Sequence, residues 1–301
     1  LNLGSALIRL NRFADAGDVF AQALKQNLGM RDIRFCLYQL AYINGDAAGM
    51  QRQIDWARGK PEEYAALYWQ AQAAAFTGNW RKAQDFSRRA IEMSARGDTN
   101  EVAARYATEQ ALLGAAFGEC LRARADAAQG LKLSRGRVSL PRAALALSLC
   151  GETNQAKRFA DELTKLYPED TIINSIWLPE IGAAMELQRG NAAHAIEQLQ
   201  TTSRYEAAAE FWPQYLRGKA YLMLKRGAEA AAEFQKILDH KGYAPLSPLY
   251  PLAHLGLARA AALTGDTARS RKAYEDFFAV WKEADADLPV LREAKREHEK
   301  R

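Results

Sequence analysis

The alternation of apolar and polar positions is clearest between Trp212 and Gly242, WPQYLRGKAYLMLKRGAEAAAEFQKILDHKG. In its first half, apolar residues recur every fourth position from Leu216, and in its second half Ala230, Phe234 and Ile237 form another apolar stripe. This period matches the α-helix and predicts two amphipathic helices. Neither helix can bury its stripe alone, so each must pack on the other and on a neighbouring pair.

The segment between the two stripes, Lys225-Arg226-Gly227, predicts a tight turn. Gly242 is expected as the C-cap that ends the second helix. The absence of a side chain at Gly218 lets the two helices approach closely, and Phe234 fills the space that remains. The stretch therefore predicts one helical hairpin.

Turn-forming residues flanked by helical apolar patterns recur eight times along the chain. Equivalent turn positions are 11, 45, 78, 118, 151, 190, 225 and 265, and successive positions are 33–40 residues apart. The extra residues of the longer steps fall in segments of loop-like composition, such as 94–99 and 245–248. The sequence therefore predicts about eight helical hairpins in residues 1–281.

The residues Gly218, Tyr221, Ala230 and Phe234 have a spacing that resembles the tetratricopeptide repeat (TPR) family. That family places Gly or Ala and then an aromatic in its first helix, and Ala and then an aromatic in its second, with a period of ~34 residues. The resemblance implies an all-α fold, a TPR-like α-solenoid whose hairpins wind into a right-handed superhelix. It also implies that the first helix of each pair lines the concave side.

The chain becomes strongly polar from Lys282 onward. A last helix is expected to begin near Leu288 and to end in a run of alternating charges. Because a repeat array needs a polar outer face at its end, we interpret residues 282–301 as a C-terminal capping helix packed by Leu288 and Leu291.

Composition fits a repeat array, with 301 residues, 49% of them hydrophobic and 26% charged. The net charge of +5 is spread over the chain, so no nucleic-acid contact is expected. The nearest approach to a basic cluster, which we interpret as a solvated helix face, is Arg122, Arg124, Lys132, Arg135, Arg137 and Arg142. No apolar stretch approaches the roughly 18 residues of a membrane span, so this region is not expected to contact a membrane itself.

The three cysteines, Cys36, Cys120 and Cys150, are odd in number, far apart and without a CxxC pair. We interpret them as small apolar core residues that form no disulfide. They therefore leave the redox compartment undetermined.

Catalytic and metal-binding motifs are absent from the sequence. There is no HExxH, no GxSxG, no Gly-rich phosphate loop, no HRD and no DFG, and the four histidines are isolated. No metal, no cofactor and no catalysis are therefore expected of this chain. The enzyme alternative is a helical-toroid glycosidase, which would need two carboxylates facing one cavity. Glu180 and Glu186 are the pair that could serve.

Several first-helix side chains are expected on the concave side, where aromatics beside Arg and Lys make good peptide anchors. They are Phe35, Gln39, Tyr68, Gln72, Phe76, Arg142, Trp177, Glu180, Trp212, Tyr215, Lys219 and Arg259. We expect Phe35 and Phe76 to pack between repeats. For Trp177, Trp212 and Tyr215, binding and packing remain equal alternatives. No first helix has the Lys and Asn pair of the TPR clamps that hold chaperone C-termini, so an internal peptide or a protein face fits better.

Three stretches resemble a narrower group. They begin at Tyr167 (YPEDTIINSIWLPEIGAAMEL), Ala231 (AAEFQKILDHKG) and Ala253 (AHLGLARAAALTGDTARSRKAYEDFFAVWKEADADLPVLREAKREH). The group is the C-terminal TPR region of bacterial membrane-linked serine/threonine protein kinases. A related region follows a winged-helix DNA-binding domain in some regulators. The resemblance implies that the chain, which lacks an initial Met, is a fragment of a protein anchored in the bacterial inner membrane.

The leading hypothesis is therefore a non-catalytic sensory or scaffolding arm, which binds a protein or peptide in its groove or mediates self-association. The alternative is a self-standing TPR scaffold in envelope assembly or chaperoning. An upstream kinase or winged-helix domain in the full-length gene would favour the first.

Overall fold

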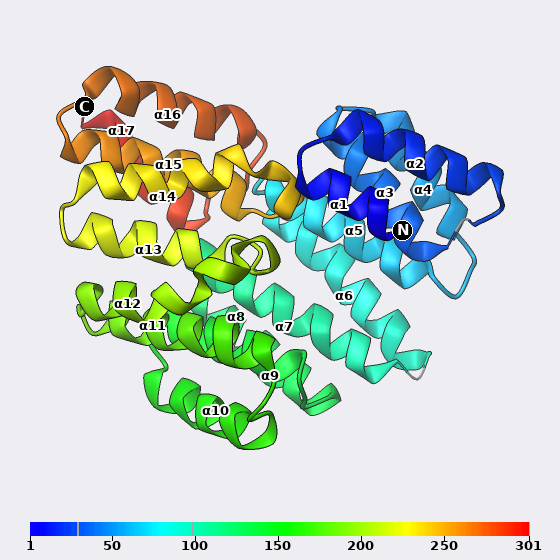
Figure 1. The fold of residues 1–301 in the computed structure, drawn as a ribbon, viewed down its shortest axis with the longest axis horizontal. Coiled ribbons are helices and arrows are strands. Elements are labelled where there is room, and N and C mark those ends of the chain that lie inside the picture. Colours follow the sequence, from blue (N-terminus) through cyan, green and yellow to red (C-terminus); the bar gives the residue numbers. More distant parts are fainter. Residues whose placement is uncertain (29, 98, 301) are drawn as a thin grey trace.

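The computed structural model describes residues 1–28, 30–97 and 99–300, and it consists of helices and turns throughout these ranges. Residues 29, 98 and 301 lie outside this description, and with them Asp98 of the expected 94–99 loop and Arg301 of the expected cap. Seventeen α-helices are described, of which the first sixteen follow one another as eight pairs (Figure 1). The predicted all-α solenoid of helical hairpins is confirmed. No described helix is long and apolar enough to cross a membrane.

The first four pairs are α1 (Asn2–Arg9) with α2 (Phe13–Lys25), α3 (Arg31–Ile43) with α4 (Ala47–Ala57), α5 (Glu63–Phe76) with α6 (Trp80–Arg96), and α7 (Asn100–Phe117) with α8 (Cys120–Leu133). The next four are α9 (Ser139–Leu149) with α10 (Thr153–Leu166), α11 (Leu178–Gln188) with α12 (Ala192–Gln198), α13 (Trp212–Met223) with α14 (Gly227–Asp239), and α15 (Leu249–Leu263) with α16 (Thr267–Val280). The last helix is α17 (Pro289–Glu299). Three irregular segments complete the fold: the π-helical η1 (Ile173–Trp177) and the 3-10 segments η2 (Leu199–Ala208) and η3 (Lys241–Tyr243).

All eight predicted turn positions carry a positive φ in the structure. They are Asn11, Gly45, Gly78, Gly118, Gly151, Gly190, Lys225 and Gly265. Six of the eight are glycine, because a residue without a Cβ adopts this left-handed conformation at little steric cost. The following amide then bonds back to a carbonyl of the helix that has ended, as the Glu119 N–H does to the Gly114 oxygen at 2.8 Å. A local backbone requirement therefore sets the repeat boundaries.

Two expected boundaries are wrong. Helix α14 ends at Asp239, so Gly242 is not its C-cap and lies in η3 instead. There its amide donates to Asn11 Oδ1 at 2.8 Å, and a Cβ at this position would lie 1.8 Å from the Ile8 oxygen. The backbone of α1 packs so closely on Gly242 that there is no space for a side chain at this position. Helix α6 also continues through Arg96, into the segment expected to be a loop.

Close approach between neighbouring hairpins depends on Phe234, which is 1% exposed. A Cβ added to Gly218 of α13 would lie 2.6 Å from its ring, and one added to Gly256 of α15 would lie 2.5 Å from it. The predicted contact between Gly218 and Phe234 is confirmed. The aromatic fills the space between two first helices, which ties the seventh hairpin to the eighth.

The C-terminal end of the chain closes on the third hairpin, in a region that we call the closing junction (Phe76, Gly78, Arg81, Trp281 and Asp285). Trp281 Nε1 donates to the Phe76 oxygen at 3.0 Å. The Asp285 N–H donates to the Gly78 oxygen at 3.0 Å, and its carboxylate accepts from the Arg81 N–H at 2.7 Å. These bonds join residues about two hundred positions apart in the sequence.

Helix α17 follows the closing junction and packs on the protein through one apolar stripe. Leu288 and Leu291 are buried. Glu293 and Glu297 of α17 pair with Arg259 of α15 at 3.2 and 2.9 Å. At its first residue, Pro289 lies against the turn at position 118, between α7 and α8. The helix thus joins the last hairpins to the middle of the array and does not stand at a free end.

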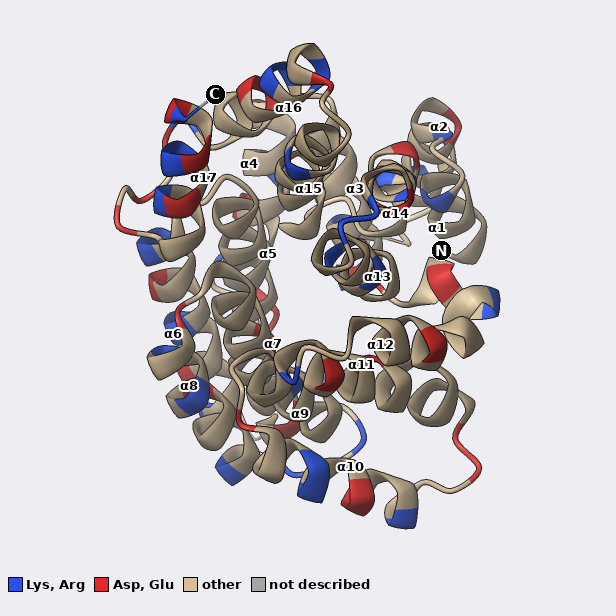
Figure 2. Cartoon of the chain, turned by 90° about the vertical axis from the view of Figure 1, so that its left-hand side faces the viewer, with Lys and Arg blue, Asp and Glu red and all other residues tan. Residues whose placement is uncertain are grey.

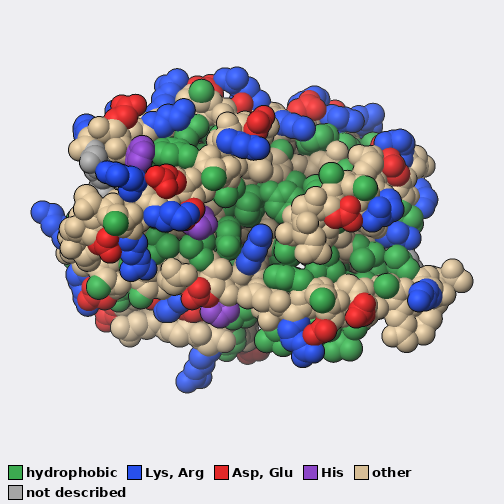
Figure 3. Space-filling view, turned by 90° about the horizontal axis from the view of Figure 1, so that it is seen from above, with side chains coloured by type: hydrophobic (Ala, Val, Ile, Leu, Met, Phe, Trp, Pro, Cys, Tyr) green, Lys and Arg blue, Asp and Glu red, His purple; other side chains and the backbone are tan. Residues whose placement is uncertain are grey.

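The N-terminal hairpin meets the segment between α14 and α15. Asn11 Nδ2 donates to the Asp239 oxygen at 2.8 Å, and Leu246 packs in one apolar cluster with Tyr38 and Trp69. Figure 2 shows the result, a ring of hairpins with α13 facing α7 and α11. Seen from above, hydrophobic side chains gather where the C-terminal and N-terminal hairpins meet, with charged groups around them (Figure 3). The expected open groove is therefore closed by the chain itself.

Candidate functional site

Two adjoining cavities occupy the inner side of the ring. The larger, which we call the central cavity, has a volume of about 460 Å³, and the smaller has about 140 Å³. Both are bordered by Arg105, Glu210 and Trp212. Their helical walls come from α3, α5, α7, α9, η1–α11 and α13, together with the end of η2. These helices are the first members of their pairs, which is the placement that the TPR resemblance implies.

The central cavity brings together four of the predicted groove residues, Arg142, Trp177, Glu180 and Trp212. The second cavity is bordered by Gln72, and also by Phe35 and Gln39 of α3. The other predicted residues, described below, lie elsewhere in the interior.

Arg142 of α9 is held on one side of the central cavity. Its Nε donates to Glu109 of α7 at 2.8 Å, and its Nη1 donates to the Val138 oxygen at 2.9 Å. Its guanidinium lies 4.9 Å from the centre of the Trp177 ring, within the range of a cation–π contact. Burial disfavours its charge most, but the attraction of Glu109 and Glu210 and the hydrogen bond to Glu109 together outweigh this, so the pKa of Arg142 is raised.

Glu180 of α11 is the most unusual group at the central cavity, because it is only 1% exposed. Neither of its carboxylate oxygens has a hydrogen-bond partner among the described residues. Burial raises the pKa of Glu180 well above its ordinary value, repulsion from Glu210 adds to the rise, and Arg142 opposes it. The surroundings of Glu180 therefore disfavour its ionised form.

Glu210 stands at the mouth of the central cavity, exposed to solvent on one side. The surrounding protein raises its pKa, repulsion from Glu109 adds to the rise, and Arg142 opposes it. Two acids with raised pKa values thus line one cavity, an arrangement common at functional sites.

The backbone around the central cavity is irregular at two places. The π-helical turn η1 runs directly into α11 and places Trp177 and Glu180 on the same wall. Glu210 and Phe211 both have positive φ values, 52° and 76°, which are rare for residues with side chains. Both kinds of irregularity concentrate at functional sites in proteins.

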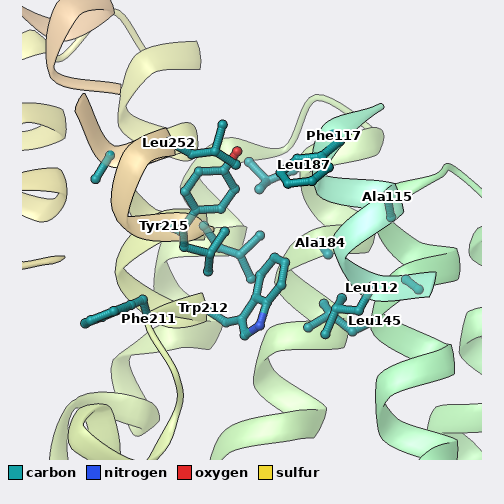
Figure 4. Packing of buried hydrophobic residues seen from close by; sticks show 14 of the residues in the cluster. Leu112, Ala115, Phe117, Leu145, Ala184, Leu187, Phe211, Trp212, Tyr215 and Leu252 are labelled. Atoms are coloured by element: carbon teal, nitrogen blue, oxygen red, sulfur yellow. The ribbon is translucent and has the colours of Figure 1, made fainter. Parts of the chain in front are cut away.

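Trp212 and Tyr215 of α13 are 3% and 8% exposed, respectively. Figure 4 shows both side chains directed from α13 toward the apolar faces of α7, α9 and α11, with Trp212 near Leu112 and Leu145. Trp212 also forms part of the cavity wall, whereas Tyr215 lies in the packed interior. Trp212 and Tyr215 are buried because α13 packs against helices on the other side of the ring. The repeat pattern alone does not predict these contacts.

The remaining predicted residues are engaged with neighbours. Tyr68 stacks on Tyr106 at 3.8 Å between ring centres. Lys219 lies 5.7 Å from the Tyr215 ring, and its pKa is lowered by burial and by the nearby Arg259. Arg259 is itself paired with α17, as described above. These three side chains do not line the central cavity.

Phe35 and Phe76 pack between repeats, as expected. Phe35 stacks on Trp69 of the next first helix, at 5.6 Å between ring centres. Phe76 meets the edge of Tyr42 at 5.3 Å and stacks on Tyr250 at 6.0 Å. Phe76 therefore helps to join the two ends of the array.

Glu186 does not line the central cavity, so Glu180 and Glu186, the pair that the glycosidase alternative could have used, do not face one cavity. The Glu186 carboxylate accepts bonds from Asn191 at 2.8 Å and Arg189 at 2.6 Å, and these bonds lower its pKa, that of Asn191 most. Six residues advance a helix by roughly 600°, so the two acids point in different directions. The glycosidase alternative loses the pair on which it depended.

Cys120 and Cys150 form a disulfide with 5.4 Å between their Cα atoms, which corrects the expectation that no cysteine is bonded. Their separation of 30 residues is close to one repeat, and each lies beside a predicted turn. Equivalent positions of successive hairpins are spatial neighbours, so this spacing was the missed signal. Cys36 is free and buried, as expected.

Sequence reasoning also missed Glu109, which bonds to Arg142. The two residues are 33 positions apart, again one repeat, and therefore occupy matching places on adjacent first helices. Glu210 carried no such signal, because it follows the irregular segment η2. The residues of the expected basic cluster are mostly paired with acids, as Arg124 is with Glu152 and Arg135 with Glu162. Among the described residues, no group of three or more His, Cys, Asp or Glu is placed to hold a metal ion.

No protein-family model matches the chain, and no curated protein matches it. Among solved structures, the chain is similar to a tetratricopeptide repeat protein from Parabacteroides merdae ATCC 43184, with 15% identity, a TM-score of 0.50, and coverage of 86% of this chain and 94% of that one. It is also aligned with the P58(IPK) TPR domain, with 14% identity and a TM-score of 0.32, over 100% of this chain and 96% of that one. These comparisons lend no support to the resemblance to kinase regions. The first similarity, together with the eight hairpins, shows that the chain has the all-α fold of a tetratricopeptide repeat array.

Proposed function

We propose that this chain is a protein-interaction module that binds a protein or peptide partner at the central cavity. The observation that carries the proposal is the half-exposed Trp177 beneath Arg142, on the inner side of the first helices. Aromatic and Arg side chains dominate the energetics of protein interfaces. The cavity volume also falls within the usual range of ligand pockets.

The closure of the ring limits the form of the partner. A broad partner surface would need an open groove, and here the aromatic side chains of α13 pack against α7, α9 and α11 on the inner side. An extended peptide, or one protruding side chain of a folded partner, fits a cavity of about 460 Å³ better. Binding through a few inserted anchors is therefore the mode that we propose.

The role of the whole protein rests on the sequence resemblance. The stretches from Tyr167, Ala231 and Ala253 support a sensory or scaffolding arm of a bacterial serine/threonine kinase or a winged-helix regulator. A self-standing scaffold is the alternative, and self-association is the alternative mode of action. The full-length gene distinguishes the arm from the scaffold, and sedimentation of the chain tests self-association.

Selection of a random peptide display library on this chain tests the proposed binding site. Peptides enriched on the wild type should lose at least tenfold in affinity for Trp177→Ala. They should bind Trp56→Ala normally, because Trp56 lies on a separate surface beside Arg34 and Lys60. Loss of binding with Trp56→Ala alone, or no enrichment at all, would contradict the proposed site. Circular dichroism of both variants checks that the fold is kept.

A further inference from the structure

Glu180 presents a physical problem that the fold itself leaves unsolved. A buried carboxyl group without a hydrogen-bond partner is strongly disfavoured, and native structures satisfy most such groups. Both Glu180 oxygens lack a partner among the described residues, although a cavity lies directly beside them. Its helix neighbour Glu186 shows that a buried acid in α11 can be fully bonded. A ligand in the cavity is the missing partner that the geometry allows.

The charges around the central cavity indicate the chemistry of that ligand. Two of its cations are already paired, Arg142 with Glu109 and Arg137 with Asp170. The side chains of the acids Glu101, Glu180 and Glu210 have no hydrogen bond or ion pair within the described residues, and the same is true of the side chain of one cation, Arg105. Acidic groups therefore outnumber basic ones among the unpaired side chains, and a bound cation would favour their ionised form, which makes a cationic ligand a better match than an anionic one.

We propose that the central cavity receives a basic side chain, lysine or arginine, of the partner peptide, with Glu180 as its counter-ion. This inference rests on the proposed function and names the anchor that the site would take. The apolar stem would lie along Trp177 and Ile176, which line the same wall. The charged head would reach Glu180, whose two free oxygens can accept from an ammonium or from the fork of a guanidinium.

Binding of a cation should be coupled to release of a proton. In the free protein, burial and repulsion from Glu210 raise the pKa of Glu180, and Arg142 partly offsets the rise. A bound positive charge lowers that pKa again, because it favours the ionised carboxylate. Glu210 is faced in turn by Glu109, Arg142, Arg105 and Arg9 of α1, so it can contribute to the same release. Affinity is therefore expected to rise with pH until Glu180 is ionised in the free protein, as long as the ligand stays protonated.

Isothermal titration calorimetry with acetylated and amidated pentapeptides provides the test, with two glycines on each side of a central lysine, arginine or norleucine. The lysine or arginine peptide should bind the wild type at least tenfold more tightly than the norleucine peptide. Titrations in phosphate and in Tris, buffers with different ionisation enthalpies, should reveal proton release. Free n-butylammonium is the fourth probe, because the same chemistry can come from a small amine.

Glu180→Gln keeps the size of the side chain and should weaken the basic peptide at least tenfold while it abolishes most of the proton release. The matched control is Glu186→Gln on the same helix, which removes a buried acid outside the cavity and should leave binding unchanged. Equal binding of the norleucine peptide, equal binding by Glu180→Gln, or no binding of any probe would overturn the inference.

The outcomes separate this inference from the proposed function. If display peptides bind through Trp177 but the basic probes do not, the interaction site stands and the basic anchor is wrong. Butylammonium could instead bind the wild type as tightly as the lysine peptide does and not bind Glu180→Gln. The cation site would then be supported, but its ligand would be a free amine and not a peptide side chain.

Discussion

The closing junction and the central cavity both join residues that are far apart in the sequence, but they differ in whether their polar groups have hydrogen-bond partners. At the junction, Trp281 Nε1 and both the amide and the carboxylate of Asp285 have partners. At the cavity, Glu180 has none among the described residues. Satisfied buried groups stabilise a fold, whereas an unsatisfied one beside an empty space indicates a place for a ligand. Substitutions at the junction should therefore affect stability, and those at the cavity should affect binding.

The largest expected effect is on stability, from Trp281→Ala at the junction. It removes a fully buried indole that packs on Phe117 and Phe277 and bonds to the Phe76 oxygen. We expect a loss of about 3–5 kcal/mol in the free energy of unfolding, measured by urea denaturation. Trp177→Ala at the cavity should lose much less, because its ring is half-exposed. Similar losses for the two variants would remove the distinction between the regions.

Removal of the disulfide tests how much the covalent link next to the central cavity contributes to stability. The link joins the start of α8 to the end of α9, the helix that carries Arg142. The double substitution Cys120→Ser with Cys150→Ser should lower the free energy of unfolding by about 2–4 kcal/mol. A reducing agent should lower the melting temperature of the wild type and leave that of the double variant unchanged. Equal sensitivity of both proteins to the reductant would argue against the link.

Gly218→Leu measures the packing between α13 and Phe234, which lies outside both regions. Any side chain here meets the Phe234 ring, so the two helices must separate, and we expect a loss of about 1–3 kcal/mol in the free energy of unfolding. Gly17→Ala is the matched control, because nothing lies within 4 Å of a Cβ in that part of α2. Relief of a helical glycine should stabilise the chain by about 0.5–1 kcal/mol. A Gly218→Leu variant as stable as the wild type would mean that this contact is not tight.

The smallest effect, and the one with the most specific sign, is the pH dependence of Glu180→Gln. Because burial and Glu210 raise the pKa of Glu180, the folded state binds the proton more tightly than the unfolded state. The stability of the wild type therefore falls as pH rises from the ordinary pKa of glutamate toward the raised folded value. Gln cannot ionise, so the melting temperature of the variant relative to the wild type should increase as the pH rises above about 4, the ordinary pKa of glutamate. A pH-independent difference would show that Glu180 is ionised throughout.

Much of the inner surface could be predicted because helical register is local. The recurrence of turns placed Arg142, Trp177, Glu180 and Trp212 on first helices, and these four residues line one cavity. The sequence placed Tyr215 and Lys219 on the correct face of their helix, but it did not predict that neighbouring side chains cover them. Register specifies which way a side chain points, and it does not specify what lies opposite.

The sequence by itself determined the eight hairpins, because a positive φ at a turn and a stripe of period 3.6 are requirements of a few adjacent residues. Tertiary structure alone decided the closure of the ring, the Cys120–Cys150 link and the place of Glu210. Each of these depends on groups far apart in the chain, whose encounter is set by small rotations accumulated from hairpin to hairpin. The apolar pattern of a single helix does not specify this accumulated rotation. The cavity and the unpartnered Glu180 can therefore be identified only in the folded chain.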